Sequence, residues 1–139
     1  DKFNLPVYIH RLDANCLINP EKNLSAMFGL AYSVKSVAWP IDDGKTINLD
    51  NLNLEIIHTP GHTPGSICIK VNNIIFTGDT LFQGGIGRTD FPGASESNLF
   101  RSIREKLLTL DDETIIYPGH GPNSTIGQER KSNPFLIGI

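Results

Sequence analysis

Short apolar runs separated by two-residue polar turns dominate the middle of this 139-residue chain. Two pairs of runs occur, one around an Asp50-Asn51 turn and one around an Asn72-Asn73 turn. Asparagine and aspartate tolerate the left-handed backbone conformation that tight hairpin turns require. The pattern therefore predicts two hairpins, with strands over Thr46–Leu49, Leu54–His58, Ser66–Val71 and Ile74–Thr77.

Further elements are predicted on both sides of these hairpins. Pro6–His10 is typical of a short strand, and Asp13 or Asn15 is expected to cap a brief helix after it. Thr114–Tyr117 is a second strand candidate, with Tyr117 expected in the core, and a short helix is predicted over Thr125–Lys131.

The strongest helix signal follows Ser95, a plausible N-cap. Apolar residues after it recur at spacings of one, three or four, which places them on one helical face. They are Leu99, Phe100, Ile103, Leu107 and Leu110.

Charge and hydropathy exclude several classes of protein. Twelve basic and fifteen acidic residues give 12 − 15 = −3, and no Lys/Arg block is longer than two, so we expect no nucleic-acid partner. No run approaches the ~18 apolar residues of a membrane span, so we expect no membrane association. Cys16 and Cys68 lack metal-site spacing, so we interpret both as buried small hydrophobic residues in a protein of the reducing cytoplasm.

Three polar residues follow strand-like segments directly after a glycine: His62, Asp79 and His120. Loops at strand ends can direct several side chains into one site, and glycine allows the sharp turn beside each of them. Two imidazoles and a carboxylate are a common ligand set for Zn²⁺ or Fe²⁺. Each residue taken alone is more often part of a turn or cap. His58 and His10 lack this glycine frame, and we expect both to be structural.

Four ordered segments carry a family resemblance: TPGHTPGS (59–66), FTGDTLF (76–82), GGIGRTDFPG (84–93) and YPGHGPNSTIGQERKSNPF (117–135). They resemble the second half of a metallo-β-lactamase-fold hydrolase of the glyoxalase II type. The resemblance implies an α+β fold, half of a four-layer αβ/βα sandwich, with a mainly antiparallel or mixed sheet flanked by helices. It also implies a two-metal site at the strand ends.

Residue roles follow from the same resemblance. His62 is expected to ligate the first metal and His120 the second, while Asp79 bridges both and is the catalytic residue. The true β-lactamases of this fold place a cysteine at the position of Asp79, so the aspartate favours the glyoxalase-like branch.

One family motif is missing. Members carry His-x-His-x-Asp-His upstream of the position of His62, whereas residues 1–61 contain only His10 and His58. Because the chain also begins without methionine, we interpret residues 1–139 as a single partial domain, the C-terminal part of a longer protein. A naturally degenerate family member is the alternative.

Neighbouring residues are candidates for supporting roles. Thr63 and Ser66 are expected to hydrogen-bond near the His62 loop. Arg88 and Asp90 are expected to brace the ligands or the substrate loop, and a simple surface ion pair is the alternative. Glu129 and Arg130 are expected to cap a helix or lie on its surface.

Three functions remain open. The first is a zinc-dependent thioester hydrolase with two metal ions, in which metal-bound hydroxide attacks S-lactoylglutathione or a related thioester. The second is a mononuclear iron persulfide dioxygenase, suggested by the GRTDF segment. The third is a non-catalytic half or interaction module, since a chain without the missing motif is expected to bind metal weakly or not at all.

Self-association is expected as well. Without the first half of the sandwich, one apolar sheet face would lack its cover, and a second copy could bury it in a homodimer. The residues expected on that face are Ile56, Ile67, Ile69, Ile75 and Ile115.

Overall fold

The computed structural model describes residues 5–34 and 38–138. The chain divides into two compact units, Asp1–Ile41 and Asp42–Ile139. The interpretation of residues 1–139 as one partial domain stays a prediction. None of the helices within the described ranges has the length and apolar character needed to cross a membrane.

The first unit contains two strands and two short 3₁₀ helices. Strand β1 (Val7–His10) pairs in parallel with β2 (Ala38–Ile41), and η1 (Arg11–Leu17) and η2 (Ser25–Phe28) lie between them in sequence. The predicted strand at 6–10 and the brief helix after it are confirmed. The predicted cap is wrong, because Nδ1 of His10, one residue before η1, accepts a hydrogen bond of 3.4 Å from the Leu12 amide.

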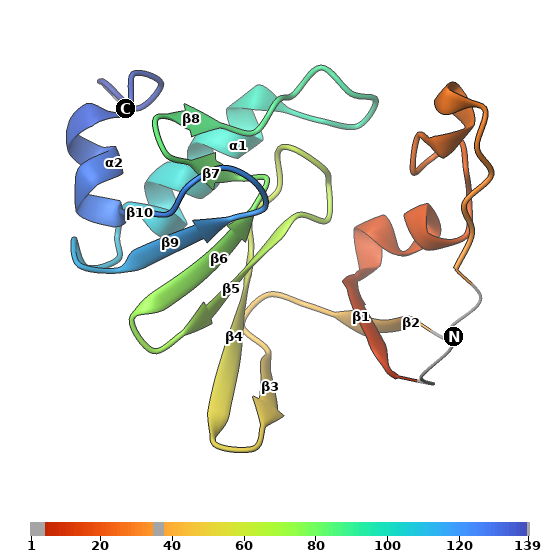
Figure 1. Cartoon of the computed structure of the whole chain (residues 1–139), viewed down its shortest axis with the longest axis horizontal. Coiled ribbons are helices and arrows are strands. Elements are labelled where there is room, and N and C mark those ends of the chain that lie inside the picture. Colours follow the sequence, from red (N-terminus) through yellow and green to blue (C-terminus); the bar gives the residue numbers. More distant parts are fainter. Residues whose placement is uncertain (1–4, 35–37, 139) are drawn as a thin grey trace. The chain divides into compact units, whose positions relative to one another are not determined.

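The second unit is built on a six-stranded sheet in the order β10-β9-β6-β5-β4-β3 (Figure 1). Its strands are β3 (Thr46–Leu49), β4 (Leu52–His58), β5 (Ile67–Val71), β6 (Ile74–Gly78), β9 (Ile115–Pro118) and β10 (Ser124–Thr125). Both predicted hairpins are confirmed: β3 pairs antiparallel with β4, and β5 with β6. Asp50 (φ 49°) and Asn72 (φ 52°) adopt the left-handed conformation inside the two turns.

The pairing of β6 with β9 is parallel, unlike the other pairings of this sheet. Gly78 at the end of β6 lies beside Pro118 at the end of β9. The residues that follow these two strands therefore emerge at the same edge of the sheet. A small antiparallel hairpin, β7 (Leu81–Phe82) and β8 (Gly85–Ile86), lies directly after β6.

Two helical segments complete the unit. Ser95 caps α1 (Glu96–Ser102) by accepting a hydrogen bond of 3.3 Å from the Asn98 amide, as predicted. The helix continues as a π-helical turn, η3 (Ile103–Leu107), and Leu110 lies beyond its end. The last helix, α2 (Ile126–Ser132), is capped by Thr125.

The helices pack against one face of the sheet. Leu99, Ile103, Leu107 and Ile126 of the helices share a buried core with sheet residues. The sheet contributes Cys68, Ile75 and Ile116. The prediction that Ile75 lies on the uncovered face is therefore wrong, because strand alternation directs it toward the helices.

The opposite sheet face is also apolar. Cross-strand register aligns Ile56 with Ile69, Ile69 with Phe76, and Phe76 with Tyr117. Ile56 is only 2% exposed, so the prediction that it lacks cover is wrong. The rings of Phe76 and Tyr117 stack with their centroids 5.8 Å apart, and the two residues are 46% and 41% exposed. The prediction that Tyr117 belongs to the core is wrong, since its neighbour Ile116 points into the core instead.

The two cysteines differ in their surroundings. Cys68 is fully buried, as predicted, and burial raises the pKa of its thiol to about 11. Cys16 is only half-buried, so that part of the prediction is wrong.

Candidate metal centre

The loop that carries His62 is held by its own backbone and by two hydroxyls. The Thr59 amide donates to Ser66 O over 2.8 Å, and the Gly61 amide donates to Thr63 O over 3.0 Å. The Ser66 hydroxyl accepts from the Thr63 amide (3.0 Å) and lies 2.8 Å from the Thr63 hydroxyl. Gly61 has φ +155°, and a Cβ there would lie 2.4 Å from Leu99. The loop thus packs tightly against α1 through a position that requires glycine.

The imidazole of His62 is oriented by a hydrogen bond on the side of the ring away from Asp79. Its Nδ1 lies 2.8 Å from the carbonyl oxygen of Arg88. A carbonyl oxygen only accepts, so the Nδ1–H donates and the lone pair of Nε2 points to the other side. That side faces Asp79, and this arrangement of a hydrogen-bonded imidazole is typical of metal-binding histidines.

The Asp79 carboxylate lies between two imidazoles. Its Oδ2 is 3.6 Å from Nε2 of His62, and its Oδ1 is 3.5 Å from Nε2 of His120. Two ligands at zinc distances from one tetrahedral ion stand roughly 3.3–3.6 Å apart. The three predicted ligands are thus brought together as two pairs, His62–Asp79 and Asp79–His120, which share the carboxylate.

Neither pair is a complete ligand set. Among the described residues, no group of three or more His, Cys, Asp and Glu side chains is gathered around one point that could hold a metal ion. The two His–Asp distances describe two separate pairs of side chains, and each pair offers two donors of the kind that metals bind. Four ligands are the usual number for zinc, so a zinc ion at either pair would need further ligands.

Two glycines let the backbone approach Asp79 closely. A Cβ on Gly87 would lie 1.9 Å from the Asp79 carbonyl oxygen and 3.3 Å from Cβ of His62. A Cβ on Gly119 would lie 2.6 Å from Oδ1 of Asp79. A side chain at either position would displace Asp79: at Gly87 it would meet the backbone carbonyl, and at Gly119 the carboxylate.

A cavity of about 500 Å³ opens beside these residues. Its wall includes Phe82, Ile86 and Phe91. The Phe82 ring stacks on His120 with a centroid distance of 4.4 Å, and the Phe91 ring meets His62 edge-on at 5.6 Å. The site therefore combines two imidazoles and a carboxylate, groups that metals commonly bind, with an apolar, largely aromatic wall.

Arg88, which lines the cavity, forms an ion pair with Asp90. The guanidinium donates two hydrogen bonds to the carboxylate, over 2.6 and 2.5 Å. The hydrogen bond from Arg88 lowers the pKa of the Asp90 carboxyl to about 2. Arg88 also lies over the Phe91 ring, 4.3 Å from its centroid. Both side chains are exposed. Arg88 contacts His62 through its backbone carbonyl oxygen and not through its charged guanidinium.

Glu129 differs from its prediction, whereas Arg130 is an exposed residue of α2, as predicted. Glu129 is 1% exposed and bonds to Ser124, Gly84 and Asn133, so the expectation of a helix-surface residue is wrong. Arg130 donates to the carbonyl oxygens of residues 108 and 110 and pairs with Asp112. The acceptors of Arg130 and the Gly84 amide lie more than 15 residues away in sequence, and a local pattern carries no signal of them.

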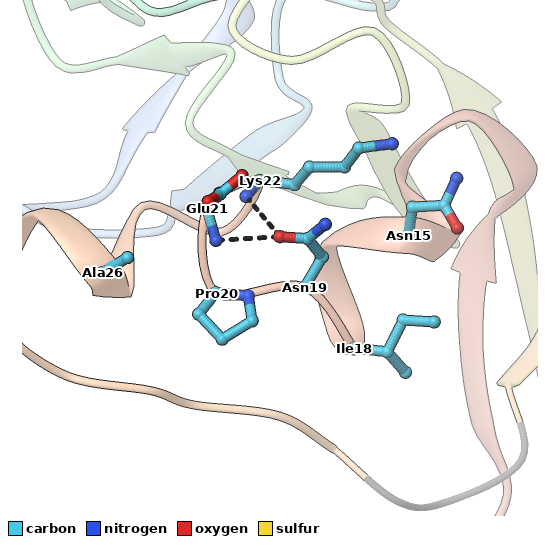
Figure 2. A pocket seen from close by; sticks show the side chains of 7 residues that line it. All are labelled: Asn15, Ile18, Asn19, Pro20, Glu21, Lys22 and Ala26. Carbon is cyan, nitrogen blue, oxygen red and sulfur yellow. Dashed lines mark hydrogen bonds between the residues drawn. The ribbon is translucent and has the colours of Figure 1, made fainter.

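A second hollow, of about 580 Å³, lies in the first unit (Figure 2). Oδ1 of Asn19 accepts hydrogen bonds from the Glu21 and Lys22 amides over 2.9 and 3.3 Å. This side chain closes a turn. The lining provides a single carboxylate, Glu21, so the hollow does not resemble the site around Asp79.

Comparisons with known proteins agree with this geometry. Residues 1–120 match the profile of the Metallo-beta-lactamase superfamily. An uncharacterized protein of Mycobacterium tuberculosis (strain H37Rv) is 44% identical over 152 aligned positions, covering 100% of this chain and 68% of the relative. The probable metallo-hydrolase YqgX of Bacillus subtilis is 40% identical, covering 100% of this chain and 67% of the relative. The hydroxyacylglutathione hydrolase GloC of Haemophilus influenzae is 55% identical over 100 positions, covering 70% of this chain and 47% of the relative.

Solved structures of metallo-beta-lactamase-fold proteins superpose closely on this chain. The BLEG-1 B3 metallo-beta-lactamase superposes with a TM-score of 0.92 at 38% identity, covering 99% of this chain and 68% of that chain. TTHA1623, solved in a di-iron-bound form, superposes with a TM-score of 0.82 at 38% identity, covering 97% of this chain and 67% of that chain.

Proposed function

Because this chain belongs to the metallo-beta-lactamase superfamily, a group of metal-dependent hydrolases, we propose that it supplies half of the active site of a glyoxalase II-like thioester hydrolase. The observation that carries the proposal is the Asp79 carboxylate, which lies 3.6 and 3.5 Å from the two imidazoles. A carboxylate placed between two imidazoles is suited to bridge two metal ions. The remaining ligands would come from a His-x-His-x-Asp-His motif that residues 1–61 do not contain.

The fit to metal rests on the donor set. Imidazole nitrogen and carboxylate oxygen are the donors that zinc and iron both accept. His62 and Asp79 would hold one ion, and Asp79 and His120 the second. Two bound metal ions supply a hydroxide at neutral pH and stabilise negative charge on a carbonyl oxygen.

The chain's own residues orient the His62 imidazole and surround the acyl group of the substrate. Arg88 O holds the Nδ1 proton of His62, so Nε2 is kept as a lone-pair donor toward the site. Phe82, Ile86 and Phe91 give the acyl group an apolar wall and exclude water beside it. The leaving thiolate requires no protonation by the protein, because thiols are weak acids whose anions leave readily.

Zinc is the metal proposed first, and a small thioester such as S-lactoylglutathione the substrate. GloC carries the name hydroxyacylglutathione hydrolase and matches 70% of this chain, which supports a glutathione-derived thioester. The proposed place of action is the cytoplasm.

The direct experiment uses the protein that carries this chain together with the His-x-His-x-Asp-His motif. It should hydrolyse S-lactoylglutathione at 1 s⁻¹ or faster, roughly the usual range of enzymes, and contain about two zinc ions per chain, as a two-metal site requires. Asp79→Asn should remove the activity, while Asp111→Asn at an exposed turn should keep it. Full activity of Asp79→Asn would refute the proposal.

A mononuclear iron persulfide dioxygenase is the second candidate. His62 is 19% exposed at its side chain, whereas His120 is 73% exposed, which favours one well-enclosed metal position at His62 and Asp79. TTHA1623 was solved in a di-iron-bound form, which supports iron as the metal but two ions rather than one. One iron per chain, with oxygen consumed in the presence of glutathione persulfide and no thioester hydrolysis, would support this candidate over the first.

A further inference from the structure

The carboxylate of Glu129 is buried, and its hydrogen bonds link the hairpin beside the site to the last helix. Glu129 is 1% exposed. It accepts hydrogen bonds from the Ser124 hydroxyl, from the Gly84 amide over 2.8 Å and from Nδ2 of Asn133 over 2.8 Å. Burial of a carboxylate is costly unless hydrogen bonds replace water. Three donors do so here, and they come from three separate segments of the chain.

These donors fix the small hairpin β7–β8 to helix α2. Gly84 lies in the turn between the two strands of the hairpin. Asn133, itself 1% exposed, donates from the same Nδ2 to Gly85 O over 3.1 Å and more weakly to Phe82 O over 3.5 Å. Glu129 and Asn133 therefore bind one donor and two acceptors of the same hairpin backbone.

The hairpin in turn carries a ring of the site. Phe82 stacks on His120 with planes inclined by 28° and centroids 4.4 Å apart. His120 is 73% exposed at its side chain, so few other groups restrict it. Ser124, which donates to Glu129, is four residues beyond His120 and ends the loop that carries it.

We propose that Glu129 and Asn133 are positioning residues, which hold the Phe82 ring and the His120 loop so that the His120 imidazole faces Asp79. The importance of that orientation for metal binding rests on the proposed function. The positioning itself is a property of this chain, and it can be measured without metal.

The experiment records the ring-proton NMR signals of His120 and His62 in the metal-free full chain at pH 8. A proton above the face of an aromatic ring is shifted upfield, so the Phe82 stack shifts the His120 signals in the unaltered chain. Phe82→Leu should remove this shift and thereby calibrate it. Glu129→Leu should also remove it, because leucine fills the space but accepts no hydrogen bond from Gly84 or Asn133. The His62 ring contacts Phe91 instead of Phe82, so the His62 signals should stay within their original range.

A conservative substitution at Glu129 should preserve the upfield shift of the His120 ring protons. In Glu129→Gln the amide oxygen can keep the Gly84 and Asn133 bonds, and the amide NH₂ can donate to the Ser124 hydroxyl, which also accepts. The His120 shift should then persist. Glu113→Gln removes the same charge at an exposed turn and serves as the matched control.

A second variant covers the case in which Glu129→Leu does not fold. Asn133→Asp keeps the shape of the side chain but replaces the donor by a carboxylate facing Oε2 of Glu129 and the Gly85 carbonyl. It should also remove the His120 shift. An unchanged His120 shift in a folded Glu129→Leu or Asn133→Asp protein would overturn the proposal, and so would equal displacement of the His62 and His120 signals, which indicates general loosening.

Metal binding separates this inference from the proposed function. In the protein with the complete ligand set, Glu129→Leu should weaken retention of one of two metal ions by about 10- to 100-fold, the usual effect of losing support behind a ligand. Loss of the His120 shift with unchanged metal retention would keep the positioning role and contradict the assignment of His120 as a ligand.

Discussion

The Nδ1 atom of His62 lies 2.8 Å from the carbonyl oxygen of Arg88. This contact joins the His62 loop to the segment after β8 and leaves Nε2 facing Asp79. The orientation of the imidazole therefore depends on both segments. The contact depends on the backbone path through residues 87 and 88, and the first prediction tests that path.

Gly87→Ala should disrupt the site, because the new Cβ would lie 1.9 Å from the Asp79 carbonyl oxygen. Overpacking of this kind costs about 1–3 kcal/mol, measurable as a lower midpoint of urea unfolding. Gly85→Ala is the matched control in the same segment, since its Cβ would meet only Phe82 at 3.8 Å. Equal midpoints for the two variants would contradict the close approach.

The Arg88–Asp90 pair should be visible as a low titration midpoint. The hydrogen bond from Arg88 lowers the pKa of Asp90 to about 2 from an ordinary 3.8. Because the folded value is depressed, the pair is fully present above pH 3.8 and is lost as the pH falls through about 2. Carboxyl ¹³C NMR should give this midpoint, and Arg88→Met should return it toward 3.8. A midpoint near 3.8 in the unaltered chain would show that the pair does not persist in solution.

The chain alone should bind metal weakly and hydrolyse thioesters marginally or not at all. Each metal position has two of its ligands here, and catalysis by bound metal depends on a preorganised site. Dialysis against zinc followed by elemental analysis should find low occupancy, and Asp79→Asn should reduce it further, since both ligand pairs lose the shared charge. Two tightly retained zinc ions per chain would contradict the expectation of an incomplete site.

The two thiols should react differently. Cys68 is fully buried, and burial raises the pKa of its thiol to about 11. Burial also raises the pKa of the Cys16 thiol, but this side chain is only half-buried and a reagent can reach it. A disulfide reagent at pH 8 should therefore label one thiol per folded chain and two in denaturant. Cys16→Ser should abolish labelling of the folded protein. Rapid labelling of both thiols without denaturant would mean that the core around Cys68 opens readily.

The chain should self-associate through the sheet face that carries Phe76 and Tyr117. Burial of ~400 Å² of apolar surface is worth on the order of 10 kcal/mol, before the several kcal/mol that association costs. Phe76→Lys should weaken the assembly, and Met27→Lys, at an exposed apolar residue of the first unit, tests whether any added charge would do so. Sedimentation equilibrium decides: a 15.3 kDa monomer at micromolar concentration would exclude the proposed homodimer.

Local patterns predicted the hairpins well, because turn residues and alternation act within a few positions. Asp50 and Asn72 both take the left-handed conformation expected of them. The patterns also brought His62, Asp79 and His120 to the same kind of position at strand ends, although nothing in local spacing reveals that β6 and β9 are parallel neighbours.

The sequence-based predictions were wrong where both faces of a strand are apolar, and where a hydrogen-bond partner lies far away in the sequence. Alternation in β9 separates Ile116 from Tyr117 but does not tell which face the helices cover. Ile75 was misplaced because the hairpin pairs it with Lys70 and not with Ile69, which puts it on the sheet face opposite Ile69. Glu129 has the character of a surface residue, and only the Gly84 amide, 45 residues away, explains why it is buried.

The parallel pairing of β6 with β9 has a consequence for the order of folding. Hairpins such as β5–β6 close over two residues, but β6 meets β9 only after the whole segment between them, including α1 and η3, has closed. Contacts across such a span form late, because the entropy of closing the loop must be lost before they are gained. The proposed metal position between Asp79 and His120 would therefore form only when the sheet is complete, so a metal ion would bind there after folding and not before it.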